Sequence, residues 1–166
     1  MSPVDGRSRR AWGWYRLTDE WAARLVKDAG IQPGELVLDI GAGTGAITAR
    51  LLAAGAHVIA VELHPGRVAH LRRRFSGTPI TVVRADAATL RLPRRPFRVV
   101  ANPPYAIASA LMRVLLSPGS RLDAADVVLQ RAVVRSYVDG TGGGRKSCAF
   151  VPSPRVDSAV LVIRRW

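Results

Sequence analysis

Leu36-Val37-Leu38-Asp39-Ile40-Gly41-Ala42-Gly43-Thr44-Gly45 is the stretch of this chain that decides the fold. Its first half is a short apolar run of the kind that forms a buried strand. Its glycines allow the backbone to turn tightly and to approach a ligand closely. Beyond them, Ile47, Leu51 and Leu52 lie on one side of a helical pattern. The stretch therefore predicts a strand, a glycine-rich loop and a helix, in that order.

The alternation of apolar runs and helical patterns continues along the chain. Further buried strands are predicted at residues 57–62, 80–84, 97–101, 126–130 and 158–164. Helical patterns lie at 65–75 and 107–116, and Thr18 is suited to cap an earlier helix. Strands that alternate with helices form a parallel sheet covered on both faces. We expect one α/β domain over residues 1–166, with a Rossmann-like, doubly wound, mostly parallel sheet.

The composition limits the partners of the chain. Its 166 residues include 25 Lys and Arg against 12 Asp and Glu, a formal net charge of +13. This excess predicts a polyanionic partner, and arginine, which binds phosphate bidentately and stacks on bases, suits RNA. The single cysteine, Cys148, excludes a disulfide framework and favours a reducing compartment. No apolar run approaches the length of a membrane span, so we expect a cytoplasmic protein without membrane contact. We also expect a monomer.

Acidic residues follow three of the predicted strands: Asp39, Glu62 and Asp86. Ligands of such sheets bind at the carboxyl ends of the strands. The glycine loop also satisfies the dinucleotide fingerprint, so the loop alone does not separate NAD from S-adenosylmethionine. Asp39 favours the second cofactor, because a carboxylate repels a pyrophosphate but accepts from a methionine ammonium. Asp86 is suited to accept from an adenine amine.

Asn102-Pro103-Pro104-Tyr105 follows the predicted strand at 97–101. Proline has no N–H and holds the preceding residue extended, so the carbonyls here are free of a helix ladder. The Asn102 amide oxygen and a backbone carbonyl are two acceptors for the two hydrogens of an exocyclic amine. Tyr105 offers a face on which a flipped base can stack. The tetrapeptide alone is equally consistent with a proline-rich turn.

In this order, Asp39–Gly45, Glu62, Asp86 and 102–105 resemble the class I S-adenosylmethionine-dependent methyltransferases that act on adenine amines. The closing segment 150–161 (FVPSPRVDSAVL) is similar to that of the rRNA adenine-N6 methyltransferases, which include the Erm resistance enzymes and the small-subunit dimethyltransferases. The amino-terminal residues 7–17 (RSRRAWGWYRL) resemble those of the short mycobacterial Erm enzymes in particular.

The resemblance implies a role for each matching residue. The target amine and its base would be held by Asn102, Pro103, Tyr105 and Phe150. The cofactor would be bound by Leu17, Asp39, Gly41, Gly43, Gly45, Glu62, Leu63, Asp86, Ala87 and Asn102. No metal is implied. The helical carboxyl-terminal domain of most members has no counterpart after residue 164, so RNA contacts are expected from Arg7, Arg9, Arg10, Arg131 and Arg135, the first three in the basic segment 1–17.

The interval before Phe150 departs from the family pattern. Members usually place a helix and an antiparallel strand there, but residues 135–149 are few and include a glycine-rich run, which predicts a shortened, flexible segment. If the strand were absent, the strand at 158–164 would be an exposed edge.

The resemblance predicts methylation of an adenine in the peptidyl-transferase region of 23S rRNA, with resistance to macrolides, lincosamides and streptogramin B. Small-subunit rRNA dimethylation, DNA adenine-N6 methylation, a non-catalytic RNA-binding module and, more remotely, an NAD dehydrogenase remain alternatives. The segment 150–161 argues against DNA, and the intact Asn102 argues against a binding module.

Overall fold

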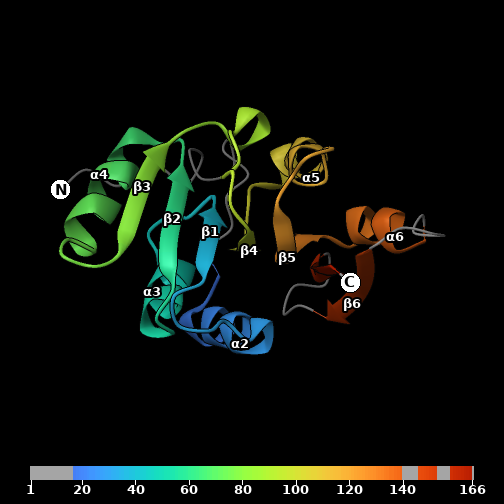
Figure 1. The fold of residues 1–166 in the computed structure, drawn as a ribbon, viewed down its shortest axis with the longest axis horizontal. Helices are drawn as coiled ribbons and strands as arrows, with labels where there is room; N and C mark the ends of the chain where they lie inside the picture. Colours follow the sequence, from blue (N-terminus) through green and yellow to red (C-terminus); the bar gives the residue numbers. More distant parts are fainter. Residues whose placement is uncertain (1–16, 140–145, 153–157, 166) are drawn as a thin grey trace.

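The computed structural model describes residues 17–139, 146–152 and 158–165, with side chains for 17–139 and 158–165. Its centre is one seven-stranded sheet in the order β3-β2-β1-β4-β5-β7-β6 (Figure 1). The strands are β1 Leu36–Ile40, β2 His57–Glu62, β3 Ile80–Arg84, β4 Phe97–Ala101, β5 Leu122–Gln130, β6 Lys146–Pro152 and β7 Ser158–Arg165. The first five are parallel, and β7 and β6 are antiparallel to their neighbours. The predicted α/β class is confirmed.

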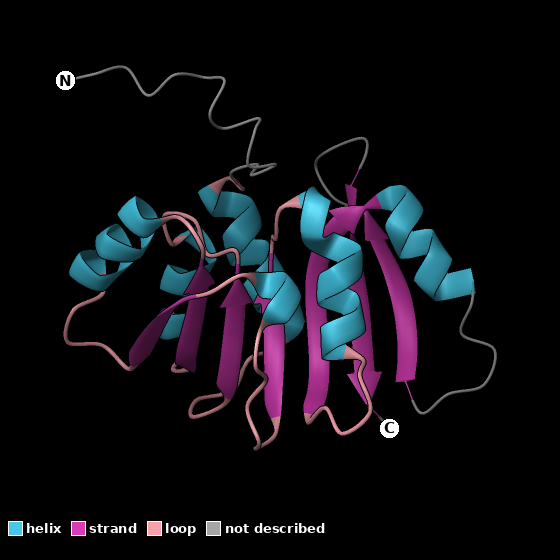
Figure 2. Ribbon diagram, turned by 90° about the horizontal axis from the view of Figure 1, so that it is seen from above, coloured by secondary structure: helices cyan, strands magenta, loops and turns pink. Residues whose placement is uncertain are grey.

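Helices cover both faces of this sheet (Figure 2). They are α2 Asp19–Ala29, α3 Ala46–Ala53, α4 Pro65–Arg74, α5 Ala108–Leu115 and α6 Arg131–Asp139, with 3-10 turns η1 Ala87–Thr89 and η2 Tyr105–Ile107. Thr18 caps α2 as predicted, since its hydroxyl accepts from the Trp21 N–H at 3.3 Å. The described helices are all too short or too polar to traverse a bilayer.

Two apolar clusters, one on each face, hold the layers together. The first joins sheet residues such as Leu38 and Val99 to Leu111 of α5 and Val134 of α6. The second joins the other face of the sheet to α2, α3 and α4. The strands are nearly continuous in apolar residues because both faces are buried.

The strand order reverses between β1 and β4. From β1 the chain builds outward through β2 to β3, and it then returns to place β4 on the other side of β1. The helices that follow these two strands, α3 and α5, consequently lie on opposite faces of the sheet, which opens a crevice at the carboxyl ends of β1 and β4. Gly41 follows β1 and Asn102 follows β4, so the fold positions the two most informative motifs at this crevice.

The expectation of a shortened, flexible segment at 135–149 stays a prediction, although regular structure covers part of these residues. Helix α6 continues to Asp139, and β6 begins at Lys146 and pairs with residues 159–165 of β7. Strand β7 therefore lies between β5 and β6 and is not an edge. Strands β5 and β7 are further joined by two hydrogen bonds, of 2.9 and 3.0 Å, from the Arg164 guanidinium to the Asp126 carboxylate.

Candidate active site

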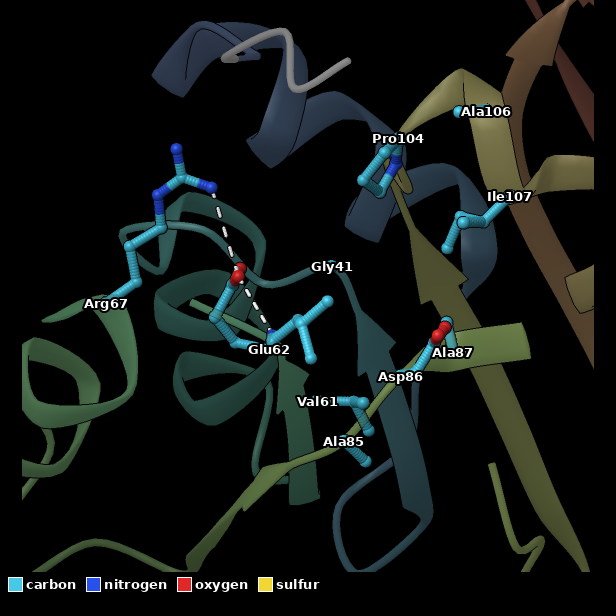
Figure 3. Close-up of a pocket in the computed structure, with 11 residues that line it drawn as sticks. Gly41, Val61, Glu62, Arg67, Ala85, Asp86, Ala87, Pro104, Ala106 and Ile107 are labelled. Atoms are coloured by element: carbon cyan, nitrogen blue, oxygen red, sulfur yellow. Dashed lines mark hydrogen bonds and ion pairs between the residues drawn. The ribbon is translucent and has the colours of Figure 1, made fainter. Parts of the chain in front are cut away.

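A cleft of about 210 Å³ lies at the carboxyl ends of the parallel strands (Figure 3). The loops after β1, β2, β3 and β4 all contribute to its lining. Five of the predicted cofactor residues are among the lining residues: Gly41, Glu62, Leu63, Asp86 and Ala87. The sheet thus brings together residues that are far apart in the sequence, as expected from their positions at strand ends.

Glu62 ends β2 and joins two loops. Its Oε2 accepts from the Gly43 N–H at 2.9 Å, and its Oε1 accepts from the N–H groups of Leu63 at 3.0 Å and His64 at 2.9 Å. The side chain is only 6% exposed, and the Arg67 guanidinium lies 3.9 Å away. A carboxylate has about four acceptor positions. Three are used by the backbone, which leaves one on Oε2 for a hydroxyl donor such as a ribose.

Asp86 precedes η1 and is the N-cap of that turn. Its Oδ1 accepts from the Ala88 N–H at 2.9 Å, which holds the side chain in place. Its Oδ2 has no hydrogen-bond partner among the described residues, and the residue is exposed at the cleft. In Figure 3 the carboxylate lies near Ile107 and Ala87, so a flat amine-bearing ring bound there would have apolar walls.

Gly41 brings the glycine loop against the loop that follows β4. Its φ is +75°, and a Cβ built on it would lie 3.0 Å from Pro104 Cδ and 3.1 Å from Pro103 Cα. A side chain at this position would push the two loops apart. The glycine is needed for this close contact, which sets the Asn102 loop directly beside the presumptive cofactor loop.

Asp39 is buried beneath the cleft and does not line it. It is 1% exposed, and its Oδ2 accepts from the Thr48 hydroxyl at 2.6 Å. Its Oδ1 is buried without a hydrogen-bond partner among the described residues. Burial raises the pKa of Asp39 from 3.8 to about 7, opposed by the hydrogen bonds from Thr48. An ammonium ion near Oδ1 would relieve this cost, so the orphaned oxygen fits the predicted role toward a methionine ammonium.

Other predicted residues support the cleft from outside it. Gly45 faces the ring of Phe75, which would lie 2.5 Å from an added Cβ, so its missing side chain serves packing against α4. Gly43 contributes its N–H to Glu62. Leu17 is buried in the same apolar cluster as Ala42 of the glycine loop. None of these three is among the lining residues of the cleft.

The Asn102 loop begins directly after β4. Asn102 is 9% exposed directly after β4, Pro103 is buried, and Tyr105 is half-buried at the start of η2. Phe150 lies in β6 opposite Leu161, and its side chain is outside the described residues. These positions are compatible with the predicted amine-binding roles, which stay predictions.

Two of the five predicted RNA-binding arginines, Arg131 and Arg135, are among the described residues. Arg131 is the first residue of α6 and is half-buried, whereas Arg135, one turn later, is exposed. Arg7, Arg9 and Arg10 lie outside the described residues.

Sequence reasoning missed several residues of the site. Arg67, Ala106 and Ile107 line the cleft, and Thr48 holds Asp39. Arg67 resembles the other arginines of α4, so nothing in the sequence distinguishes it. Thr48 carried a usable signal, because a threonine in the first turn of a helix after a glycine loop is positioned to reach back to the preceding strand.

The fold is that of the Rossmann-like methyltransferases, and the site suits S-adenosylmethionine, the cofactor of that class. Residues 15–149 match the family model described as ribosomal RNA adenine dimethylase. The chain belongs to this family.

Named relatives agree with this assignment. A ribosomal RNA small subunit methyltransferase of Arabidopsis thaliana is 36% identical, covering 84% of this chain and 46% of its own length. Ribosomal RNA small subunit methyltransferase A of Alcanivorax borkumensis is 32% identical, covering 93% of this chain and 65% of its own length. The chain thus spans between about half and two thirds of these relatives.

Solved structures extend the comparison. The crystal structure of the 23S rRNA methyltransferase ErmE has a TM-score of 0.78 and 30% identity, over 92% of this chain and 70% of that one. A dimethyladenosine transferase from Plasmodium falciparum has a TM-score of 0.72 at 24% identity, over 87% of this chain and 61% of that one, which shows the fold alone. The resemblance to rRNA adenine methyltransferases is confirmed, and the narrower resemblance to Erm enzymes stays a prediction.

Proposed function

We propose that this chain transfers methyl groups from S-adenosylmethionine to the N6 amine of an adenine in the peptidyl-transferase region of 23S rRNA. The observation that carries the proposal is the contact of Gly41 with the Pro103 backbone and the Pro104 ring. It sets a cofactor loop and an amine-binding loop side by side at the crevice of a sheet. Methylation of that adenine would add bulk that blocks macrolides, lincosamides and streptogramin B.

The cofactor supplies an electrophilic methyl group on a positively charged sulfur. The remaining acceptor position of Glu62 suits its ribose, the free oxygen of Asp86 suits its adenine amine, and Asp39 suits its ammonium. Glu62 and Asp86 border the cleft, whereas Asp39 lies buried behind the glycine loop, so contact between its Oδ1 and an ammonium would require that loop to move.

The chain's own residues would position the second reactant. The Asn102 amide oxygen and the Pro103 carbonyl accept the two hydrogens of the target amine, which favours a pyramidal nitrogen with an available lone pair. Tyr105 stacks on one face of the flipped base, and Phe150 on the other. Catalysis would rest on positioning and electrostatics, with the proton leaving to solvent after transfer, so no general base is assigned.

Two rRNA targets have specific support. The likeness to ErmE, and the residues 7–17 that resemble Erm enzymes, favour 23S rRNA. The curated small-subunit relatives favour 16S rRNA as the second candidate. DNA methylation has no support from the family match.

Both targets are tested in one experiment. Protein-free 23S and 16S rRNA are incubated with the chain and isotope-labelled S-adenosylmethionine, and the modified nucleotide is mapped by primer extension and nucleoside mass spectrometry. We expect label on N6 of one 23S adenine, and none with Asn102→Ala. Label on 16S rRNA alone would replace the proposal by the second candidate, and label on neither would refute both.

A further inference from the structure

The connection from η1 to β4 carries three arginines on one short segment. Arg91, Arg94 and Arg95 are exposed, and none has a hydrogen bond or ion pair among the described residues. By contrast, Arg98 just beyond them pairs with Glu35 at 3.1 Å. We call residues 90–95 the arginine ridge.

The ridge is anchored to the sheet. Leu90 and Leu92 pack against the apolar cluster of the α5 face, so Arg91 between them projects outward. Pro93 fixes a backbone angle in the middle of the segment. The arginines are therefore presented from a supported backbone, which lowers the entropy lost when they bind a ligand.

Two hollows flank the ridge, and no acidic residue of the described part of the chain lines either of them. One, of about 480 Å³, is shared by Arg94 and by Arg121 from the connection between α5 and β5. The other, of about 540 Å³, lies between the ridge and the β1–β3 face of the sheet and is lined by all three ridge arginines. The Phe97 N–H donates to the Arg121 carbonyl at 3.2 Å, which joins the two connections. Asp123, the acid nearest in sequence to Arg121, lines neither hollow.

We infer that the arginine ridge, together with Arg121, binds the sugar–phosphate backbone of the substrate RNA. The inference rests on the proposed function for the identity of the RNA. Unpaired guanidinium groups match phosphates bidentately, and a chain of net charge +13 already favours a polyanion over a protein surface. An acidic protein is the competing occupant.

The position of the ridge decides which part of the RNA it contacts. The ridge precedes β4, and Asn102 follows the same strand. Five residues of strand span about 17 Å. The ridge therefore lies too far from Asn102 to touch the flipped adenine, and it would hold phosphates of the flanking RNA.

The test compares two triple variants. Arg91→Ala with Arg94→Ala and Arg95→Ala removes the ridge charges. The control, Lys27→Ala with Arg50→Ala and Arg73→Ala, removes three exposed cations from the helices of the opposite sheet face. Affinity for an rRNA fragment containing the target adenine is measured by fluorescence anisotropy between 50 and 300 mM salt, as conditions of the assay. Calorimetry with S-adenosylmethionine checks that both variants are folded.

Each lost phosphate contact lowers the slope of log K against log salt by about 0.7 to 0.9. We expect the ridge variant to lose about 2 from this slope and about 10- to 100-fold in affinity at low salt. In the control variant the same slope should fall by less than about 0.5. Methylation by the ridge variant should show a raised KM for RNA with kcat unchanged.

The outcomes separate this inference from the proposed function. An unchanged slope in a ridge variant, while the wild-type chain methylates rRNA, overturns the inference alone. Equal losses in both triple variants also overturn it, because the effect would be one of net charge. Binding that depends on the ridge without any methyl transfer supports the inference and refutes the proposed function. Absence of RNA binding by the wild type overturns both.

Discussion

Replacing Asp39 by Asn should remove a pH dependence from the folding stability. Burial raises the pKa of Asp39 from 3.8 to about 7, so the folded chain holds this proton more tightly than the unfolded chain. The resulting stabilisation is fully present below pH 3.8 and is lost as the pH rises through about 7. The displacement corresponds to about 4 kcal/mol in total, of which about 3 kcal/mol is lost between pH 5 and 8.

The assay is urea unfolding of wild type and Asp39→Asn from pH 5 to 8 without cofactor. The unfolding free energy of the wild type minus that of Asp39→Asn should fall by about 3 kcal/mol from pH 5 to 8. Asp123→Asn, at an exposed carboxyl of β5, should track the wild type throughout. A difference that stays constant or grows with pH would refute the reasoning, because Asp39 would then be ionised in the folded chain.

Three other outcomes follow from the same geometry. Because an ammonium pairs with the ionised form of Asp39, affinity for S-adenosylmethionine should rise about fivefold from pH 6 to 7 by calorimetry, below the range in which an α-amino group loses its proton. A flat profile in wild type would contradict this pairing. Gly41→Ala, with φ +75° and a proline 3.0 Å from the new Cβ, should lose methylation. Gly34→Ala, with φ +83° and open space around the new Cβ, has the same backbone cost of about 1–2 kcal/mol in stability but should keep methylation. Equal activities of the two variants would exclude the loop contact as a requirement. Arg164→Ala should lower the free energy of urea unfolding by about 2–3 kcal/mol, because it leaves Asp126, which is 3% exposed, without its ion pair. The cost is smaller than for a fully buried pair because the Arg164 side chain is 36% exposed. A loss below about 0.5 kcal/mol would show that the pair is dispensable.

The parallel part of the fold was predictable because its signals are local. Each of the first four strands is a short apolar run, and the helices α3, α4 and α5 follow β1, β2 and β4. The boundaries of β5 and β6 were not predictable in this way. Residues 122–125 (LDAA) have weak strand propensity. They belong to β5 because β4 pairs with them on one side and β7 pairs with β5 from residue 124 onward on the other. Strand β6 begins just after a glycine-rich run, and its register is set by β7, which is distant from the signals of residues 135–149.

The site was predictable at the level of strand ends but not of side-chain partners. Asp39, Glu62 and Asp86 follow parallel strands, so their convergence at one edge of the sheet is a consequence of topology. Which of them lines the cleft depends on side-chain direction. Asp39 is within β1 and turns into the packed interior toward Thr48, whereas Glu62 and Asp86 border the cleft. Sequence alone gives no access to that difference.

The contact between Gly41 and the loop after β4 explains how few side chains this chemistry requires. Donor and acceptor of a methyl group must be held in line, and effective positioning of this kind accounts for several kcal/mol of a barrier. Here the two loops meet directly, with the Pro104 ring and the Pro103 backbone at 3.0 and 3.1 Å from the missing Cβ of a glycine. Relative placement of the two reactants is therefore a property of strand order and of one glycine, and it is independent of the basic surface that we propose to bind RNA. Changes on that surface should alter which RNA is bound and how tightly, while the geometry of transfer at Asn102 stays the same.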